Sequence, residues 1–130
     1  MEAFDAIPYN MAIMADRGVV VSVNSDSGER VRRLYQEAAM GIKYGGMSET
    51  EALKMITLNP AKQIGMDAHV GSIEVGKDAD IVIFNGHPFA PASRVEKTLV
   101  DGVVYFDSDQ AMTLEKLLQL RPRVTTENQP

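Results

Sequence analysis

The stretch VVVSVNSDS, residues 19–27, decides the fold that we expect for this chain of 130 residues. Its first five residues are apolar and β-branched except for Ser22, which predicts a β-strand over residues 19–23. A strand with one face in water would alternate apolar and polar residues, so this pattern indicates a strand covered on both faces, as in a parallel sheet. The strand leads to a lone carboxylate, Asp26, where α/β enzymes carry functional residues.

Helical patterns and capping residues predict four helices around this strand, over residues 8–16, 28–45, 48–56 and 59–64. The second follows an apolar stripe at helical spacing and ends at a pair of glycines. The third begins with a capping box formed by Ser48 and Glu51. The fourth begins at Asn59, which we expect to be the N-cap, with Pro60 at the first helical position.

The second half of the chain predicts a small antiparallel β unit and a terminal helix. Short strands are predicted over residues 81–84, 95–100 and 103–106, and the last two flank Asp101-Gly102, a two-residue hairpin turn. A final helix is predicted over residues 110–120. Because no second parallel strand is predicted, the partners of residues 19–23 must come from outside this sequence, from another chain or from the later strands.

Composition and charge exclude several classes of function. The net charge of −5 provides no basic footprint for nucleic acid, and the apolar runs are far too short to span a membrane. The chain has no cysteine, which excludes disulfides and thiol chemistry. Acidic residues closely follow Met1, so no signal peptide is predicted. We therefore expect a cytoplasmic protein without nucleic-acid or membrane partners.

Asp26 admits two interpretations when its position alone is considered. Aspartate is among the best helix N-caps, and Glu29 three residues later would complete a capping box. A carboxylate at the end of a buried strand also suits catalysis, because it can bind a divalent cation and accept a proton from water. Position alone favours the cap, and the catalytic interpretation stays open beside it.

Other polar residues are expected to be structural or exposed to solvent. His69 and His87 lie in predicted loops, where surface histidines are expected rather than metal ligands. Residues 77–80 lack the regular oxygen spacing of a calcium site and are predicted to form a polar turn before a strand. The arginines of the second helix predict a solvated face or, as the less favoured alternative, contact with an anionic substrate group; they are Arg30, Arg32 and Arg33.

Three segments of the chain carry a likeness to a known family. They read VSVNSDS at residues 21–27, EALKMITLNPAK at residues 51–62 with Gly65 after it, and VGSIEVGKDADIVIF at residues 70–84. With these segments the chain resembles the C-terminal portion of the metal-dependent amidohydrolase superfamily. The likeness is closest to its imidazolonepropionase-like and prolidase-like members and extends to about Asp107.

The resemblance implies an α/β fold, namely the C-terminal fragment of a TIM-like (β/α)8 barrel plus part of a small β-sandwich. Residues 1–66 would hold the last barrel strand and the helices after it, and residues 67–107 part of a composite sandwich. Residues 108–130 would form a terminal helix and a loose tail. Because family members build the sandwich from both ends of the full chain, we expect either a missing N-terminal half or a homo-oligomer.

The resemblance also implies metal-dependent hydrolysis. Members bind one or two divalent metals, commonly zinc, through a His-x-His pair, a lysine or glutamate, two further histidines and the aspartate of the last strand. Only that aspartate has a counterpart here, Asp26, which becomes the candidate metal ligand and the candidate catalytic proton acceptor. Since a catalytic zinc takes about three protein ligands, we expect this chain alone to hold no metal tightly.

The function implied is hydrolysis of carbon–nitrogen bonds in a small-molecule amide, with dipeptides or N-acyl amino acids as the favoured substrates. As a C-terminal fragment, the chain is expected to be inactive alone. One alternative is a non-catalytic, self-associating structural module in which Asp26 merely caps a helix. Another is one half of a split enzyme that a second polypeptide completes in trans.

Overall fold

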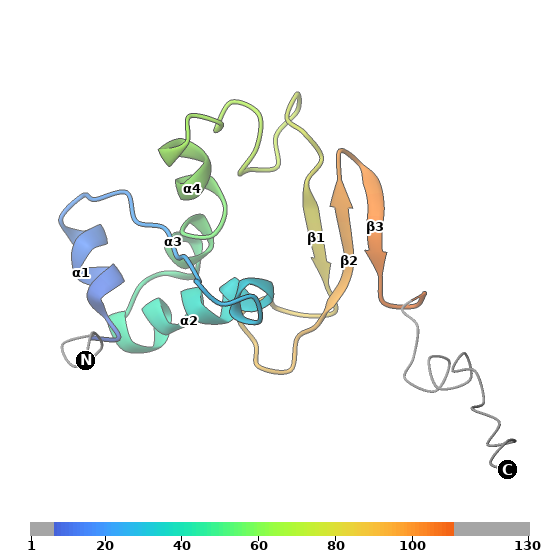
Figure 1. Cartoon of the computed structure of the whole chain (residues 1–130). Coiled ribbons are helices and arrows are strands. Elements are labelled where there is room, and N and C mark those ends of the chain that lie inside the picture. Colours follow the sequence, from blue (N-terminus) through green and yellow to red (C-terminus); the bar gives the residue numbers. More distant parts are fainter. Residues whose placement is uncertain (1–6, 111–130) are drawn as a thin grey trace, which may run out of the picture.

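Helices and a small sheet occupy two sides of the computed structural model, which describes residues 7–110 (Figure 1). The helical elements are α1 (Asn10–Asp16), the 3₁₀ turn η1 (Arg30–Arg33), α2 (Leu34–Gly45), α3 (Glu49–Lys54) and α4 (Leu58–Gln63). The strands that follow are β1 (Ile81–Phe84), β2 (Val95–Val100) and β3 (Val103–Asp107). The predicted terminal helix lies, beyond residue 110, outside the described residues. None of the helices described here is long and apolar enough to cross a membrane.

The helices pack closely because small residues lie at their contacts. Ala12 of α1 meets Gly45 of α2 so closely that a Cβ atom on Gly45 would overlap the Ala12 methyl group. The buried cluster is formed by Ala12, Val21, Met47 and Met55. Val21 therefore ties the extended segment at residues 19–23 to the helices, although the core that it joins is small.

The capping box predicted at the start of α3 is present. Ser48 is the N-cap, and its Oγ accepts a hydrogen bond from the Glu51 N–H at 3.2 Å. The Glu51 carboxylate in turn accepts one from the Ser48 N–H at 3.1 Å. The Ser48 hydroxyl also donates to the Glu51 carboxylate at 2.8 Å. This bond and then the one from the Ser48 N–H lower the pKa of Glu51 and so favour its charged form beside the helix N-terminus.

The sheet is antiparallel with the strand order β1-β2-β3. Its hairpin turn is formed by Asp101 and Gly102, whose φ angles are 50° and 76°, as predicted for a two-residue turn. The Asp101 N–H also donates to the Asp80 carboxylate at 3.0 Å, which joins the turn to the entry of β1. The sheet leaves much apolar surface exposed, at Val82, Ile83, Val103, Val104, Tyr105 and Phe106.

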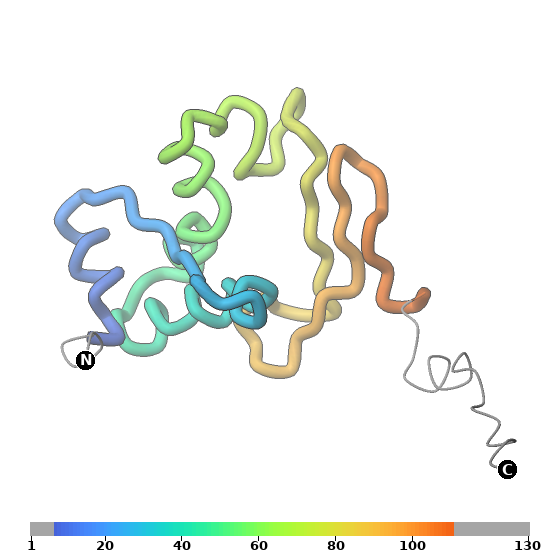
Figure 2. The backbone as a smooth tube through the Cα atoms, in the orientation of Figure 1, coloured from blue at the N-terminus to red at the C-terminus, as the bar shows by residue number. Residues whose placement is uncertain are grey.

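The strand predicted over residues 19–23 is not formed. The segment is not in any sheet of the described part of the chain, and Figure 2 shows it crossing the helices apart from the three strands. Val19 and Val20 are 52% and 48% exposed, so the cover expected on both faces is absent as well. A strand needs neighbours to pair its backbone groups, and the three strands of residues 7–110 pair with one another instead.

Asn59 is also placed differently from its prediction as an N-cap. Thr57 occupies the N-cap position of α4 and makes no side-chain capping bond, and Asn59 lies inside the first turn. Pro60 fits this turn because the N–H that it lacks would have no intrahelical partner there. Gly65, with a φ of 71°, follows the end of the helix as predicted.

Candidate functional site

Asp26 lies on the bend between the extended segment and η1, and its side chain is exposed. Its one hydrogen-bond contact is long, because Asn24 Nδ2 lies 3.4 Å from Asp26 Oδ1. The ion pairs found among residues 7–110 do not involve this carboxylate. Its oxygens therefore keep lone pairs available for a cation or a proton.

The loop around Asp26 is held by short-range hydrogen bonds of its own polar residues. The Ser25 N–H donates to Asn24 Oδ1 at 2.8 Å, and Ser25 Oγ donates to the Ser27 carbonyl at 3.0 Å. The Ser27 N–H donates to Ser25 Oγ at 3.2 Å. Such side-chain-to-backbone bonds define tight turns, so the loop has a defined shape while the Asp26 side chain stays exposed.

An open hollow of about 360 Å³ surrounds the loop and brings two further charges next to Asp26. Arg30 of η1 and Glu37 of α2 both line it, together with Asn24, Ser25 and Ser27. The Arg30 guanidinium makes no hydrogen bond or ion pair with any residue in the range 7–110. Glu37 was not a candidate in the sequence, where its only signal is an acidic residue in the first turn of α2.

The cap interpretation of Asp26 finds no support in this geometry. The N-cap of η1 is Glu29, and no side chain there makes a capping hydrogen bond. The nearest approach to a cap is the Arg30 N–H, which lies 3.5 Å from Ser27 Oγ rather than near Asp26. The predicted box of Asp26 with Glu29 is therefore wrong, because the chain bends at residues 26–27 before the helical turn begins.

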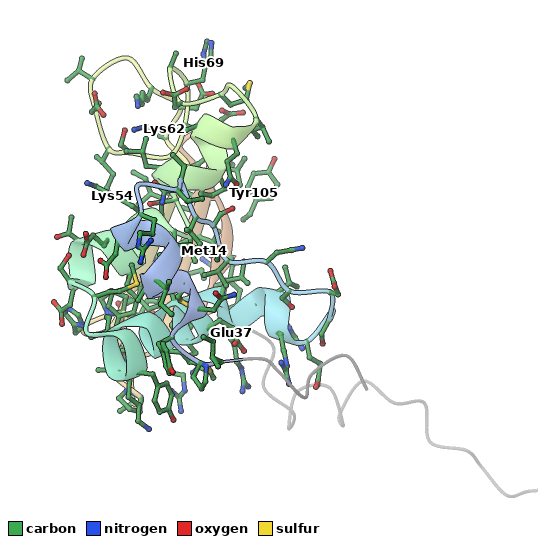
Figure 3. The ribbon with its side chains drawn as sticks, turned by 90° about the vertical axis from the view of Figure 1, so that its left-hand side faces the viewer. Met14, Glu37, Lys54, Lys62, His69 and Tyr105 are labelled. Atoms are coloured by element: carbon green, nitrogen blue, oxygen red, sulfur yellow. The ribbon has the colours of Figure 1, made fainter. Side chains whose placement is uncertain are left out.

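The residues described do not form a metal centre by themselves. No group of three or more histidines, cysteines, aspartates or glutamates lies close enough to hold an ion among residues 7–110. His87 Nε2 lies 3.2 Å from a Glu49 carboxylate oxygen at the surface. Figure 3 shows His69 at the top of the molecule, apart from Glu37, which lines the hollow beside Asp26. Asp26 alone falls short of the three ligands that a catalytic zinc takes.

The polar turn before β1 has a structural role. Lys77 Nζ donates to the Asp67 carbonyl and to Ser72 Oγ, both at 2.6 Å, and lies 3.3 Å from the Glu74 carboxylate. Hydrogen bonds from Ser72 and then Lys77 lower the pKa of Glu74. Lys77 therefore joins three points of the loop over residues 67–77.

Three known proteins that resemble this chain are each considerably longer than it is. The amidohydrolase family model matches residues 9–106. An imidazolonepropionase from Thermoplasma volcanium is 30% identical over 120 residues, covering 86% of this chain and 30% of the relative. The urease subunit alpha of Edwardsiella ictaluri is 30% identical over 129 residues, covering 85% and 23%. The crystal structure of an amidohydrolase from Thermotoga maritima superimposes with a TM-score of 0.76 at 37% identity, covering 82% and 28%.

Proposed function

This chain belongs to the amidohydrolase family, and we propose that it is the C-terminal part of a metal-dependent hydrolase that cleaves carbon–nitrogen bonds. It spans less than a third of the length of the relatives described above, so the activity belongs to a larger assembly. The observation that carries the proposal is the exposed Asp26 carboxylate, which lies in a hollow without an ion-pair partner among residues 7–110.

The proposed assembly assigns a place to both halves of the chain. Residues 1–66 would contribute the last strand of a TIM-like barrel and the helices after it, and residues 67–107 part of a composite β-sandwich. The unpaired extended segment supports the first assignment, because barrel neighbours would pair its backbone. The exposed apolar side chains of the sheet support the second, because a facing sheet would cover them. The missing strands would come from an upstream region of the same protein or from a second polypeptide.

Asp26 would have two roles in this assembly. Its carboxylate would be one ligand of a divalent metal, which is commonly zinc in this family. The remaining ligands would come from outside the described residues. Such a metal would supply an activated water and a Lewis acid when bound. The same carboxylate would accept a proton from the attacking water and return it to the leaving nitrogen.

The hollow beside Asp26 supports a substrate with an anionic group. Arg30 lines this hollow with its guanidinium unpaired among residues 7–110, and guanidinium groups bind carboxylates in bidentate geometry. We therefore favour dipeptides or N-acyl amino acids, each of which carries a carboxylate close to the scissile amide. The imidazolonepropionase and the urease subunit are named for different substrates, so their names support cleavage of carbon–nitrogen bonds rather than one substrate.

The substitution Asp26→Asn tests this proposal in the complete enzyme, in which the upstream residues precede this chain. Asparagine keeps the shape of the side chain but is a poor proton acceptor. Turnover is expected to fall by about 10²- to 10⁴-fold with little change in KM, since a positioned general base contributes that much. The matched control is Asp16→Asn, an exposed aspartate of α1 that does not line the hollow. Near-normal turnover in the Asp26 variant would refute the assignment.

A further inference from the structure

Two amide side chains of α4 hold the segment that leads to Asp26. Asn59 Nδ2 donates to the Val21 carbonyl at 2.7 Å, and Gln63 Nε2 donates to the Val20 carbonyl at 2.8 Å. Asn59 and Gln63 are four residues apart, so they lie on the same face of the helix. The two amides therefore bind the consecutive carbonyls of Val20 and Val21 from one helix face.

Residues 20–23, which pair with no strand among residues 7–110, bind this part of the chain through further hydrogen bonds. The Val23 N–H donates to the Met55 carbonyl at 3.0 Å, just after α3. Ser22 Oγ hydrogen bonds to Gln63 Oε1. Among residues 7–110, the hydrogen bonds of the 20–23 backbone thus all go to residues 55–63. The course of the segment depends on α4 and the residue that ends α3.

The Asn59 amide is available for this contact because α4 does not use it. Thr57 is the N-cap, and no side chain caps the helix. The Asn59 contact is partly buried, whereas the Gln63 contact is exposed. Loss of the Asn59 donor would leave the Val21 carbonyl without a partner close to the buried Val21 side chain, which is the costlier loss of the two.

We propose that Asn59 is a positioning residue for Asp26, because its side-chain amide fixes the Val21 carbonyl and with it the segment from which the Asp26 loop starts. The loop at residues 24–27 is tied by its own hydrogen bonds, so we expect a shift of the segment before it to displace the loop and Asp26 together. This inference rests on the proposed role of Asp26 in catalysis. Gln63 acts in the same direction, with a smaller effect.

Hydrogen exchange of the Val23 amide in this chain tests the structural half of the proposal. Asn59→Asp keeps the size of the side chain but, when ionised, presents an acceptor to the Val21 carbonyl. Exchange at Val23 is expected to speed up about tenfold, as for the loss of one partly buried hydrogen bond. The control Lys62→Ala, an exposed neighbour on α4, should leave it unchanged. Unchanged exchange in the Asn59 variant would refute the proposal.

Turnover of the complete enzyme tests the catalytic half. Asn59→Asp should lower kcat by about 10- to 100-fold with KM nearly constant, because misplacement of a reacting group by about 1 Å costs that much. A double-mutant cycle separates positioning from general destabilisation. In the Asp26→Asn background, Asn59→Asp should have no further effect on kcat, although Val23 exchange still speeds up.

The outcomes distinguish failure of this inference from failure of the proposed function. Full turnover in the Asn59 variant, while Asp26→Asn is inactive, would refute the positioning role and leave the role of Asp26 intact. An equal loss of kcat from Asn59→Asp in both backgrounds would also refute it, since the side chain would then act on folding alone. Full turnover of Asp26→Asn would refute the proposed function and, with it, any positioning for catalysis.

Discussion

The segment at residues 19–23 and the hairpin at residues 95–107 each contain four valines but have different structures. In the hairpin, β2 pairs with β1 on one edge and with β3 on the other, whereas the segment pairs with no strand within residues 7–110. Strand β2 pairs with β3, which begins only two residues later, after the turn at Asp101-Gly102. The difference teaches that β-branched residues form a strand only where backbone partners are within reach.

The two regions also lack different neighbours. The segment lacks strands at its edges, and helix side chains from α4 take two of its carbonyls instead. In the sheet, β2 is paired on both edges, but no layer within the described part of the chain covers its exposed apolar side chains. Tyr105, for example, is 74% exposed. The proposed assembly would supply strand partners to the segment and a covering layer to the sheet.

The largest expected effect is the gain of activity when residues 19–23 pair with the neighbouring strands of the proposed barrel. This chain alone should show no turnover in an amidase and dipeptidase screen and should not retain stoichiometric zinc after dialysis, because Asp26 supplies one ligand where about three are needed. Addition of the upstream region, fused or in trans, should produce both. Zinc retained by the chain alone, with turnover that Asp26→Asn abolishes, would contradict this prediction.

The second expected effect is self-association through the exposed sheet. Edge strands and exposed apolar faces recruit other chains, so sedimentation equilibrium at micromolar concentration should give a mass above the 14.2 kDa of one chain, a twofold dimer being the simplest closed form. Tyr105→Lys on the edge strand β3 should shift the equilibrium toward monomer. Val31→Lys, at an exposed apolar residue of η1 outside the sheet, is the control. A clean monomer with unfolding independent of concentration would show that the missing neighbours are not needed.

Local features of this fold could be predicted from the sequence. The capping box of Ser48 and Glu51 and the turn at Asp101-Gly102 depend on residues at most three positions apart, so their chemistry is complete within a short window. The amidohydrolase family was likewise predicted from three segments and confirmed by the match over residues 9–106.

Features that depend on distant parts of the chain could not be predicted in this way. Asn59 has the sequence context of an N-cap, but its amide bonds to Val21, 38 positions earlier. The strand propensity of residues 19–23 assumed neighbours that residues 7–110 do not supply. At the candidate site, Asp26 was predicted from the sequence. Glu37 was identified only in the structure, where it lies on α2 and lines the same hollow.

A smaller effect is expected from Gly102, whose conformation closes the hairpin. Its φ of 76° is in the left-handed region, and a Cβ atom would meet only the Ala79 methyl group at an ordinary 3.8 Å. Gly102→Ala should therefore lower the free energy of unfolding by roughly 1–2 kcal/mol through backbone strain alone. The control Gly28→Ala lies in open space without a left-handed φ. Urea unfolding measures both, and equal effects would mean that the turn does not hold the hairpin.

The smallest effect is expected from the ion pair that crosses the same hairpin. Lys97 Nζ donates to Asp107 Oδ2 at 2.8 Å, which lowers the pKa of Asp107 and raises that of Lys97.

A lowered carboxyl pKa stabilises the fold above the unfolded value of about 4, and this stabilisation is lost as pH falls through the folded pKa of Asp107. The raised lysine pKa stabilises below about 10.5, and its contribution is lost as pH rises through the folded pKa of Lys97. The urea midpoint should therefore decline at both extremes, and Asp107→Asn should flatten the acidic decline, whereas Asp16→Asn should not. Because the Lys97 side chain is 40% exposed, salt should weaken the pair. An acidic decline of the same slope in Asp107→Asn would show that the hairpin depends on its turn and register rather than on this pair.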